Sequence, residues 1–315
     1  MKIAIFCQKT DFNEEQQRKL SELGEVVYAD SVGEQPIENW ITLADGADIL
    51  AFDPDAFGGF EKAQDGRLIK LMDSSPNLKG VALATTSFGW IDLDYCRKRN
   101  IAVTNVPFYS TESVAEHAIG LLINLAKKII LTDRRTQKGS YRMDMGFELK
   151  GKTLGVIGLG HIGSRVAELG SAIGMKVIAY NRTAKQKENV EIKSLDAVLA
   201  LADAISINLA DNQETEGFIS EKEIEKMKPG VIVVNLASRE IVDEDVMAKA
   251  LQSGKVAAYT FEGEDLENGP LAKIETAIGL QGFGWYTAEA LEKAMEIWTK
   301  NIIALAKNDS ADRVD

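Results

Sequence analysis

Histidine and cysteine are scarce in this chain, and their scarcity limits its chemistry. Two of the 315 residues are histidine and two are cysteine. The cysteines, Cys7 and Cys96, cannot form a disulfide framework, and no Cys-x-x-Cys or Cys/His cluster predicts a zinc site. We expect two reduced thiols, no bound metal, and only two imidazoles, His117 and His161, to move protons near neutral pH.

Long apolar runs and an excess of positive charge are also missing. No uninterrupted apolar segment approaches the roughly 18–20 residues that a membrane helix needs, and the chain opens on a strand-like segment instead of a signal peptide. The 36 basic and 48 acidic residues give a formal charge of −12, which disfavours nucleic-acid binding. We therefore expect a cytoplasmic protein that contacts neither membrane nor nucleic acid.

The remaining composition is typical of a globular protein with two domains. Apolar residues make up 45% of the chain, and about 150 residues per domain is usual. Two series of apolar runs alternate with amphipathic stretches, which predicts two parallel sheets with helices on both faces. The predicted strands are Ile3–Phe6, Val26–Tyr28, Ile49–Phe52, Val81–Ala84 and Ile101–Thr104, then Thr153–Ile157, Lys176–Tyr180, Ala204–Asn208, Val231–Asn235 and Ala257–Phe261. The predicted helices include Glu14–Leu23, Arg67–Ser74 and Asp92–Arg99, then Ser164–Ile173, Leu195–Leu201, Glu221–Met227, Asp243–Leu251 and Thr287–Lys307.

A long helix is predicted between the two series. The segment Ser113-Val-Ala-Glu116 has the form of a capping box at its start, and apolar residues then recur at helical spacing for about 17 residues. Because the apolar arc is wide, the helix buries one face on its own domain and another on a partner subunit, or it lies between two domains.

The sharpest local motif is a Gly-x-Gly-x-x-Gly sequence at residues 158–163. It follows a predicted strand and opens a predicted helix, which is the setting of a dinucleotide-binding turn. Gly158 permits a tight turn, Gly160 lets the backbone approach a pyrophosphate, and Gly163 lets helix and strand pack closely. The motif therefore predicts a doubly wound, Rossmann-like domain that binds a dinucleotide.

The end of the next strand indicates which dinucleotide binds. An acidic side chain there would hold the ribose hydroxyls of NAD, but this chain has Asn181, Arg182 and Thr183, with Lys185 nearby. No carboxylate at this position repels a 2′-phosphate, and the planar guanidinium of Arg182 can donate two hydrogen bonds to such a phosphate. We predict NADP(H) in preference to NAD(H). The alternative is that Arg182 only stacks on adenine or faces water.

Six segments of the chain resemble one enzyme family. They are Val103–Pro107, Ser113–His117, Gly151–Gly160, Met227–Gly230, Val242–Glu244 and Trp285–Thr287. Together they are similar to the D-isomer-specific 2-hydroxyacid dehydrogenases, which include glyoxylate/hydroxypyruvate reductases and phosphoglycerate dehydrogenases. The resemblance runs from about residue 45 to residue 305 in the family's order and spacing.

The resemblance implies two Rossmann-like domains with a cleft between them, a small carbonyl or hydroxy compound as substrate, and a homodimer. A flavodoxin-like substrate domain would comprise residues 1–100 and 286–315, and the dinucleotide-binding domain would comprise residues 101–285. Cofactor contacts are expected at Gly158, Leu159, Gly160, His161, Ile162, Gly163, Asn181, Arg182, Thr183, Leu209, Ala210, Thr215, Leu236, Ala237, Thr260 and Gly282.

The resemblance breaks at the catalytic residues. The family uses an arginine that binds the substrate carboxylate, a histidine that moves a proton, and a carboxylate that orients the histidine. Aligned without gaps, Ser238 stands at the arginine position and Gly282 at the histidine position. The carboxylate remains as Asp265, or as Glu264 if the loop shifts by one residue. Arg239 would replace the arginine only if the backbone bulges locally.

Neither histidine of the chain fills this gap. Relatives carry a histidine at the position of His117 that is not the proton donor, and we expect packing or a helix–loop hydrogen bond there. His161 lies in the glycine turn, where it can touch the pyrophosphate. Thr260 replaces an aspartate that usually contacts the nicotinamide amide. The substrate loop reads Thr85-Thr86-Ser87-Phe88 where relatives often show Gly-x-Gly, so its hydroxyls would donate hydrogen bonds to the substrate.

Three functions are compatible with this pattern, since fold does not determine function. The first is an NADP(H)-dependent reductase of a carbonyl compound, in which Tyr286, Tyr259, Arg239, a carboxylate or water supplies the proton. The second is a catalytically inactive dinucleotide-binding protein that acts through a protein partner. The third is an ordinary 2-hydroxyacid dehydrogenase. We favour the first, because the departures gather on the inferred active-site wall while the cofactor motifs are intact.

Overall fold

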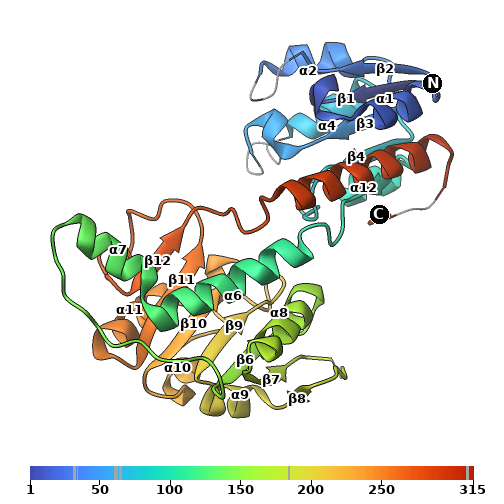
Figure 1. The fold of residues 1–315 in the computed structure, drawn as a ribbon. Helices are drawn as coiled ribbons and strands as arrows, with labels where there is room; N and C mark the ends of the chain where they lie inside the picture. The colour runs from blue at the N-terminus through green and yellow to red at the C-terminus, as the bar shows by residue number, and fades with distance from the viewer. Residues whose placement is uncertain (31–32, 34, 60–62, 64–65, 184, 310–311) are drawn as a thin grey trace. The chain divides into compact units, whose positions relative to one another are not determined.

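The chain folds into two compact units. The computed structural model describes residues 1–30, 33, 35–59, 63, 66–183, 185–309 and 312–315. Unit 1 comprises Met1–Tyr109 and Ala288–Asp315, and unit 2 comprises Ser110–Thr287 (Figure 1). Each unit is built on one parallel sheet, which confirms the predicted α/β fold class.

Unit 1 contains a five-stranded sheet in the order β2-β1-β3-β4-β5. All of its strand pairs are parallel, and β3 and β4 are buried along their whole length, as expected for strands covered on both faces. The strand order reverses between β1 and β3. The bounds are Lys2–Ile5 for β1, Glu25–Tyr28 for β2, Ile49–Phe52 for β3, Gly80–Leu83 for β4 and Ala102–Thr104 for β5.

Helices cover both faces of this sheet and form two separate cores. Trp40, Leu71 and Cys96 belong to the core under α2, α4 and α5, whereas Leu20 and Trp298 belong to the core under α1 and α12. The bounds are Glu14–Ser21 for α1, Ile37–Ala44 for α2, Arg67–Asp73 for α4, Leu93–Lys98 for α5 and Ala288–Ala306 for α12, with short 3-10 turns at Lys9–Asp11 (η1) and Pro54–Phe57 (η2).

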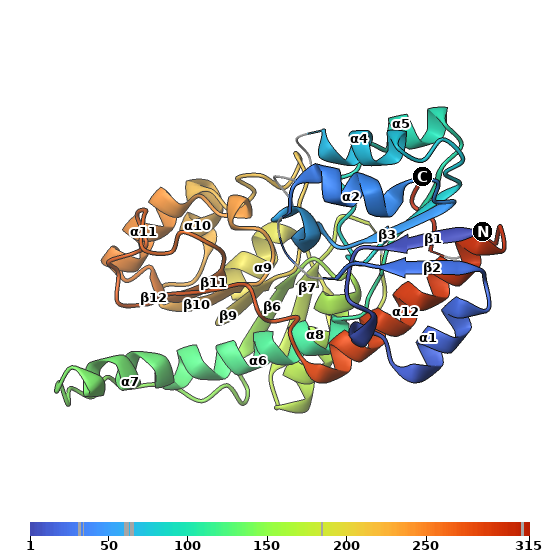
Figure 2. The same ribbon diagram turned by 90° about the horizontal axis from the view of Figure 1, so that it is seen from above.

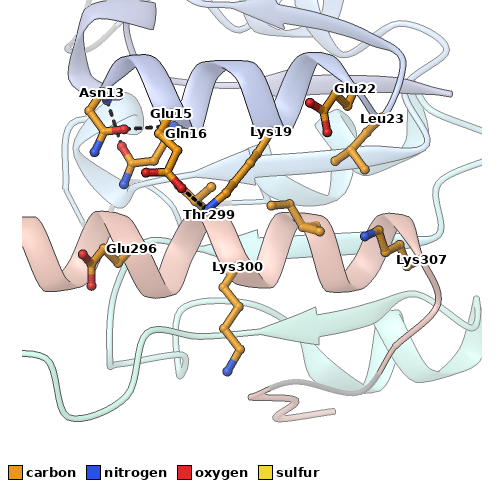
Figure 3. Close-up of a pocket in the computed structure, with 11 residues that line it drawn as sticks. Asn13, Glu15, Gln16, Lys19, Glu22, Leu23, Glu296, Thr299, Lys300 and Lys307 are labelled. Atoms are coloured by element: carbon orange, nitrogen blue, oxygen red, sulfur yellow. Dashed lines mark hydrogen bonds and ion pairs between the residues drawn. The ribbon is translucent and has the colours of Figure 1, made fainter.

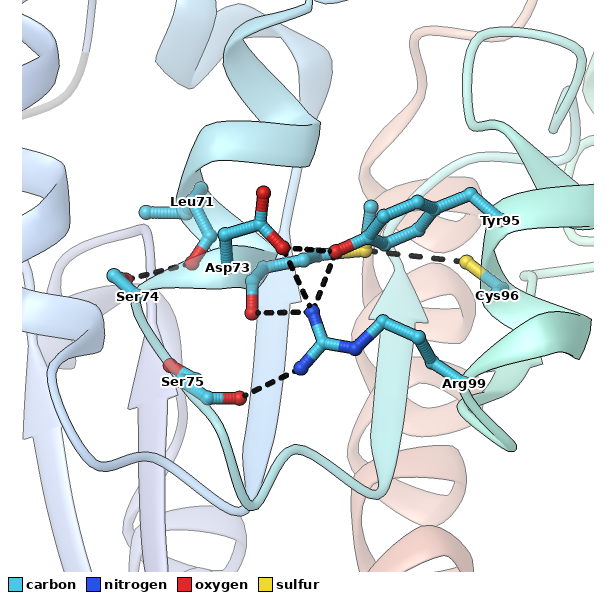
Figure 4. A network of polar contacts seen from close by, with 8 residues as sticks. Leu71, Asp73, Ser74, Ser75, Tyr95, Cys96 and Arg99 are labelled. Atoms are coloured by element: carbon cyan, nitrogen blue, oxygen red, sulfur yellow. Dashed lines mark hydrogen bonds and ion pairs between the residues drawn. The ribbon is translucent and has the colours of Figure 1, made fainter.

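A polar network joins the ends of α4 and α5 (Figure 4). The Arg99 guanidinium donates to the carbonyl oxygen of Met72 at 3.1 Å and to Oδ1 of Asp73 at 3.1 Å. The hydroxyl of Tyr95 donates to the same carboxylate oxygen at 2.5 Å. Arg99 thereby adds a hydrogen bond to a carbonyl at the C-terminal end of α4 that also accepts from the backbone N–H of Ser75 at 3.3 Å.

Unit 2 contains a seven-stranded parallel sheet in the order β12-β11-β10-β9-β6-β7-β8. The five strands predicted here are present, and β8 and β12 extend the two edges. The bounds are Thr153–Ile157 for β6, Lys176–Tyr180 for β7, Val190–Ile192 for β8, Ala204–Ile207 for β9, Val231–Asn235 for β10, Val256–Glu262 for β11 and Ala277–Leu280 for β12.

The helices of unit 2 also cover both faces of their sheet. One core lies beneath α6 and α8, and the other beneath α9, α10 and α11. The bounds are Thr111–Lys127 for α6, Ile129–Gln137 for α7, His161–Ala172 for α8, Leu195–Leu201 for α9, Glu221–Lys226 for α10 and Glu244–Ser253 for α11, with a 3-10 turn at Arg239–Ile241 (η3).

The predicted start of the long helix is wrong. Helix α6 begins at Thr111 after Ser110, and Ser113 lies inside its first turn. The Ser113 hydroxyl donates to the carbonyl oxygen of Gly284 at 2.6 Å, so it serves a distant loop and not a capping box. The helix ends at Lys127, its C-cap Lys128 has a left-handed φ of 58°, and α7 follows directly (Figure 2). Within unit 2, α6 packs against α8 and β10.

The division between the units differs from the predicted boundaries at residues 100 and 286. Strand β5 pairs with β4, so residues 101–109 lie with unit 1. The C-terminal tail reinforces this edge, because Thr104 forms an antiparallel bridge with Arg313 and the backbone N–H of Val314 donates to the Val103 carbonyl at 2.9 Å.

Both cysteines are free and buried. Burial raises the pKa of the Cys7 thiol, with smaller contributions from Asp11 and Asp53, and burial raises the pKa of Cys96 to about 11. In the part of the chain that the structure describes, no helix combines the length and apolarity needed to span a membrane.

Candidate functional site

Two glycines of the turn after β6 are required by close backbone contacts. Gly158 has a φ of +94°, and a Cβ there would lie 2.5 Å from the carbonyl oxygen of Asn208. A Cβ on Gly163 would lie 1.9 Å from the carbonyl oxygen of Gly158. Gly160 differs, because no atom lies within 4 Å of where its Cβ would stand. The turn is therefore tight on its inner side and open at Gly160.

The open side of this turn is the N-terminal end of α8. The helix begins at His161 with Gly160 as its N-cap, and no side chain caps its first turn. Helix N-termini carry partial positive charge and backbone N–H groups that lack intrahelical partners. An exposed, uncapped terminus behind an open glycine fits a phosphate group.

Asn181, just beyond β7, links the glycine turn to the neighbouring loop. Its side-chain Oδ1 accepts a hydrogen bond from the backbone N–H of Leu159 at 2.9 Å. Its Nδ2 donates to the carbonyl and the hydroxyl of Thr183 at 2.9 and 3.0 Å. A neutral amide therefore stands where an acidic side chain would hold the ribose hydroxyls of NAD.

Two cations, Arg182 and Lys185, follow Asn181 in the chain. The Arg182 guanidinium, 76% exposed, forms an ion pair with the exposed Glu214. The Lys185 ammonium donates to the carbonyl oxygen of Leu159 in the glycine turn. Exposed ion pairs contribute little to stability, on the order of 0–1 kcal/mol, so an anionic ligand competes easily with Glu214 for Arg182.

The loop after β9 lies beside the glycine turn at the point where the strand order of unit 2 reverses. The Leu209 side chain comes within 3.1 Å of the Cβ position of Gly158. The Thr215 hydroxyl donates to the carbonyl of Ala210 at 2.7 Å and so closes this loop. Ligands of doubly wound sheets bind at such a reversal, outside the carboxyl ends of the strands.

The turn after β10 is shaped by the fully buried Asn235. Its Oδ1 accepts from the backbone N–H of Ala237 at 3.1 Å, and its Nδ2 donates to the Ser238 carbonyl at 3.0 Å. Leu236 packs against the core beneath α6 and α8. The Ser238 hydroxyl donates to the Glu240 carboxylate, which lowers the pKa of Glu240. The hydroxyl of Ser238, at the predicted arginine position, thus already has a hydrogen-bond partner.

Arg239 is held by other residues of unit 2. Its Nε and Nη2 donate to the two carboxylate oxygens of Glu244 at 2.8 and 2.9 Å. Its Nη1 donates to the Glu264 carbonyl, and the guanidinium lies 5.3 Å from the centre of the Phe261 ring. The Glu244 carboxylate raises the pKa of Arg239 further. This bidentate pair uses the donors that a substrate carboxylate would need.

The remaining residues of the predicted site on β11 and beyond differ in exposure. Glu264 and Asp265 are exposed, and Asp265 has a left-handed φ of 49°. Thr260 is fully buried and its hydroxyl donates to the carbonyl oxygen of Ile278 at 2.9 Å. Of these, only the two carboxylates are presented to solvent.

The loop that contains Gly282 is held from one side by a glutamate and a histidine. Glu262 Oε1 accepts hydrogen bonds from the backbone N–H groups of Gly284 at 2.9 Å and Phe283 at 3.2 Å. The same oxygen lies 3.1 Å from Nε2 of His117, whose ring packs edge-on against Phe283 with centroids 4.8 Å apart. Gly282 itself is exposed, with no atom within 4 Å of its Cβ position.

Glu262 was not predicted as a site residue. It contacts a loop 21 and 22 residues further along the chain. The one local signal is a charged side chain at the end of a strand whose other residues are mostly buried. His117 reaches the same loop from α6. Together they position the backbone around Gly282 without occupying its place.

The substrate loop of unit 1 uses its own hydroxyl groups internally. The Thr85 hydroxyl donates to the Ser87 carbonyl at 2.7 Å, and the Thr86 hydroxyl donates to the Val106 carbonyl at 2.7 Å. Phe88, at the end of the loop, is 37% exposed. The backbone N–H groups of Thr86, Ser87 and Phe88 have no acceptor among the residues that the structure describes, so they are the loop's open donors.

A separate groove of about 720 Å³ lies between α1 and α12 in unit 1 (Figure 3). Its walls carry three lysines and three glutamates, and one pair, Lys19 and Glu15, forms an ion pair at 2.6 Å. This balance of charge selects no ligand class. Over the described ranges of the chain, no group of three or more His, Cys, Asp or Glu side chains is arranged to hold a metal ion.

Comparisons with known proteins agree with this geometry. Residues 119–280 match the family model for the NAD binding domain of the D-isomer specific 2-hydroxyacid dehydrogenases. The glyoxylate reductase of Thermococcus litoralis is 34% identical over 256 residues, which cover 76% of this chain and 77% of that protein. The chain belongs to the D-isomer specific 2-hydroxyacid dehydrogenase family. It is therefore related to oxidoreductases that bind nicotinamide dinucleotides.

Further relatives and solved structures are also similar to this chain. The D-3-phosphoglycerate dehydrogenase of Archaeoglobus fulgidus is 36% identical over 76% of this chain, which spans about half (47%) of that longer protein. A glyoxylate reductase from Paecilomyes thermophila has a TM-score of 0.84 at 26% identity, covering 99% of this chain and 98% of that one. An acyclic imino acid reductase solved with NADPH and D-Arg has a TM-score of 0.82 at 25% identity, with full coverage of both chains.

Alanine substitutions in the glycine turn should separate packing from cofactor contact. In Gly163→Ala the Cβ meets the Gly158 carbonyl, so we expect the free energy of unfolding to fall by about 1–3 kcal/mol and dinucleotide affinity to fall with it. Gly160→Ala has ordinary backbone angles and open space. It should change stability by less than about 0.5 kcal/mol but weaken binding, because its Cβ fills the space that a pyrophosphate needs.

Chemical denaturation and fluorescence titration with NADPH measure the two effects on the same samples. Equal loss of stability in both variants, or full affinity in Gly160→Ala, would contradict this assignment of the turn.

Proposed function

We propose that this family member is an NADP(H)-dependent reductase of a carbonyl compound, with a catalytic site that departs from that of its relatives. The observation that carries the proposal is the contrast between two parts of unit 2. The glycine turn, the uncapped α8 and the loop around Asn181 are built to hold a dinucleotide. The positions of the family's arginine and histidine hold Ser238 and Gly282.

The cofactor preference rests on charge. Asn181 is neutral, so no carboxylate at that position repels a 2′-phosphate, and two cations, Arg182 and Lys185, follow it in the chain. Arg182 can exchange its contact with Glu214 for a bidentate contact with a phosphate. The imino acid reductase of similar fold was solved with NADPH, which is consistent with this choice.

Each part of the site has a definite task in the proposed reaction. NADPH, when bound, supplies a hydride to the substrate carbon. The backbone around Gly160 and the start of α8 hold its pyrophosphate, Arg182 holds its 2′-phosphate, and Glu262 with His117 positions the loop of Gly282. Gly282 has no side chain that can donate a proton, so an alkoxide product must take its proton from water or a more distant group.

A simple 2-keto acid should be a poor substrate. The bidentate pair with Glu244 keeps Arg239 from replacing the family's arginine. A hydrogen bond to a charged group contributes about 1.5–3 kcal/mol, so its loss should weaken binding of a carboxylate by about 10- to 150-fold. A neutral or differently charged carbonyl compound loses nothing by this change.

The second candidate function is a non-catalytic dinucleotide-binding protein that acts through a protein partner. The exposed glycine at the predicted proton-donor position favours this second function, since a non-catalytic protein needs no proton donor. The third candidate is an ordinary 2-hydroxyacid dehydrogenase, which would turn over glyoxylate or hydroxypyruvate.

Steady-state assays of NADPH oxidation should distinguish the three functions. We expect turnover of at least one aldehyde or ketone, with glyoxylate and hydroxypyruvate at least about tenfold less efficient because the arginine is missing. Efficient turnover of glyoxylate would instead show an ordinary dehydrogenase. Binding of NADPH in a titration without turnover of any carbonyl compound would favour the non-catalytic function.

Substitution at Arg182 should separate the two cofactors. Arg182→Ala removes the charge beside the 2′-phosphate, so NADPH affinity should fall by about 10-fold or more, while NADH affinity should change little. Glu214→Gln removes the competing carboxylate and should tighten NADPH binding by a few fold. Arg97→Ala, which removes an exposed, ion-paired arginine of unit 1, is the matched control. Equal effects of Arg182→Ala on NADPH and NADH would refute the preference.

We also propose that a second copy of the chain covers α7 and the loop that follows it. The apolar side chains Ile129, Tyr141, Met143 and Met145 there are 55%, 81%, 91% and 93% exposed. The segment is nevertheless anchored, because the buried Arg135 donates to Glu275 and Asp144. An anchored segment with apolar side chains in solvent fits a homodimer interface.

Sedimentation of the purified protein should therefore show a dimer. The pair of substitutions Met143→Glu and Met145→Glu should shift it to monomer by placing charge in the interface, with circular dichroism unchanged. Leu201→Glu, at an exposed leucine of α9, is the control and should leave the dimer intact. A monomeric wild-type protein at micromolar concentration would exclude this interface.

A further inference from the structure

The substrate loop of unit 1, residues 85–88, directs its backbone donors and acceptors to opposite sides. Residues 86–88 are exposed, and their backbone N–H groups have no acceptor among the residues that the structure describes. The carbonyls of residues 85–87, by contrast, each accept a hydrogen bond from unit 1. The first of them, the Thr85 carbonyl, accepts from the backbone N–H of Val106 at 3.0 Å. The loop therefore offers donors to solvent while its acceptors are satisfied within the unit.

Side chains hold the other two carbonyls of the loop. The Thr86 carbonyl accepts from Nδ2 of Asn105 at 2.8 Å. The Ser87 carbonyl accepts from Nε1 of Trp90 at 2.8 Å and from the Thr85 hydroxyl at 2.7 Å. Asn105 and Trp90 are thus the two side chains from outside residues 85–88 whose N–H groups anchor carbonyls of the loop.

Each anchored carbonyl also sets the direction of the N–H that follows it. In a planar trans peptide, the C=O of one residue and the N–H of the next point in opposite directions. The bond from Asn105 to the Thr86 carbonyl therefore turns the N–H of Ser87 away from the interior. In the same way, the bond from Trp90 to the Ser87 carbonyl turns the N–H of Phe88 outward.

The two anchoring side chains are themselves fixed by the core of unit 1. Asn105 is 6% exposed and Trp90 is 3% exposed. The Asn105 carbonyl accepts from Nδ2 of Asn301 on α12 at 2.7 Å, and its backbone N–H donates to the Asp312 carbonyl at 3.2 Å. The Trp90 ring packs against Phe52 of β3, with centroids 5.8 Å apart. The direction of the loop's N–H groups is therefore determined by packing outside the loop.

Building on the proposed function, in which this loop receives the substrate, we propose that Asn105 and Trp90 are positioning residues for the substrate's carboxylate. Successive backbone N–H groups bind anions without a charged side chain, and hydrogen bonds to an ionised acceptor are stronger than those between neutral groups. Neither side chain touches the carboxylate. Each acts through one peptide plane, Asn105 on the N–H of Ser87 and Trp90 on the N–H of Phe88.

Titration with oxamate, an unreactive carboxylate, tests this proposal by nuclear magnetic resonance. The full chain is used with saturating NADPH, so that the phosphate turn of unit 2 is filled. In the wild-type protein, the amide protons of residues 86–88 should move downfield and reach a plateau at millimolar oxamate. Asn105→Ala and Trp90→Phe should each raise the dissociation constant about 2- to 10-fold. The downfield shift should shrink most at Ser87 in the first variant and at Phe88 in the second.

Two controls separate positioning from general stability. Ser75→Ala removes a buried hydrogen bond to the Ala44 carbonyl, 2.6 Å long and elsewhere in unit 1. It should lower the thermal midpoint but leave the oxamate dissociation constant unchanged. Thr85→Val and Thr85→Ser form a milder pair, because only valine removes the hydroxyl that donates to the Ser87 carbonyl. Valine should weaken oxamate binding, and serine should preserve it.

The possible failures are distinguishable. Unchanged oxamate affinity in Asn105→Ala and Trp90→Phe, or an equal loss in Ser75→Ala, would overturn the positioning role. Absence of any oxamate-dependent shift at residues 86–88 of the wild-type protein would overturn the proposal at its root. Neither result concerns hydride transfer, because NADPH oxidation by a neutral aldehyde or ketone tests the reductase function without a carboxylate.

Discussion

The close approach of α8 to the turn after β6 is the constraint on which the cofactor site depends. A methyl group on Gly163 would overlap the Gly158 carbonyl, and one on Gly158 would overlap the Asn208 carbonyl. These two contacts hold the first turn of α8 against the carboxyl edge of the sheet. The helix N-terminus, the Asn181 side chain and the loop of Leu209 can meet at one place only because that contact is made. The same constraint leaves Gly160 as the opening through which a phosphate reaches the backbone.

The charged side chains near the predicted catalytic positions form contacts within the protein. Arg239 retains a positive charge beside the place of the family's arginine, yet it binds Glu244 and the Glu264 carbonyl. Glu262 binds the backbone of the loop that carries Gly282. These contacts stabilise the turns around the site. The charged groups that make them are therefore not available to bind a substrate or move a proton.

Sequence patterns predicted the elements whose signals are local. Apolar runs predicted all strands of the first sheet and five of the second, without β8 and β12, to within one or two residues at each end, and the glycine spacing predicted the turn and the helix behind it. The helix start at Ser113 was wrong, because the capping pattern is present but its hydroxyl bonds to a loop 171 residues away. Strand β12 and the role of Glu262 were missed for the same reason, since pairing with β11 and contact with residues 283–284 depend on the folded chain. Whether Arg239 is available to a substrate could be judged only from its partners.

The Asn181 side chain links two loops that are both predicted to contact the cofactor. Its amide accepts from Leu159 in the phosphate turn and donates to Thr183 in the loop that meets the ribose. An aspartate would keep the acceptor for Leu159 but lose the donor, and it would place a carboxylate oxygen opposite the Thr183 carbonyl. A substitution at residue 181 therefore changes the hydrogen bonds of the turn after β6 and of the loop beyond β7 at the same time.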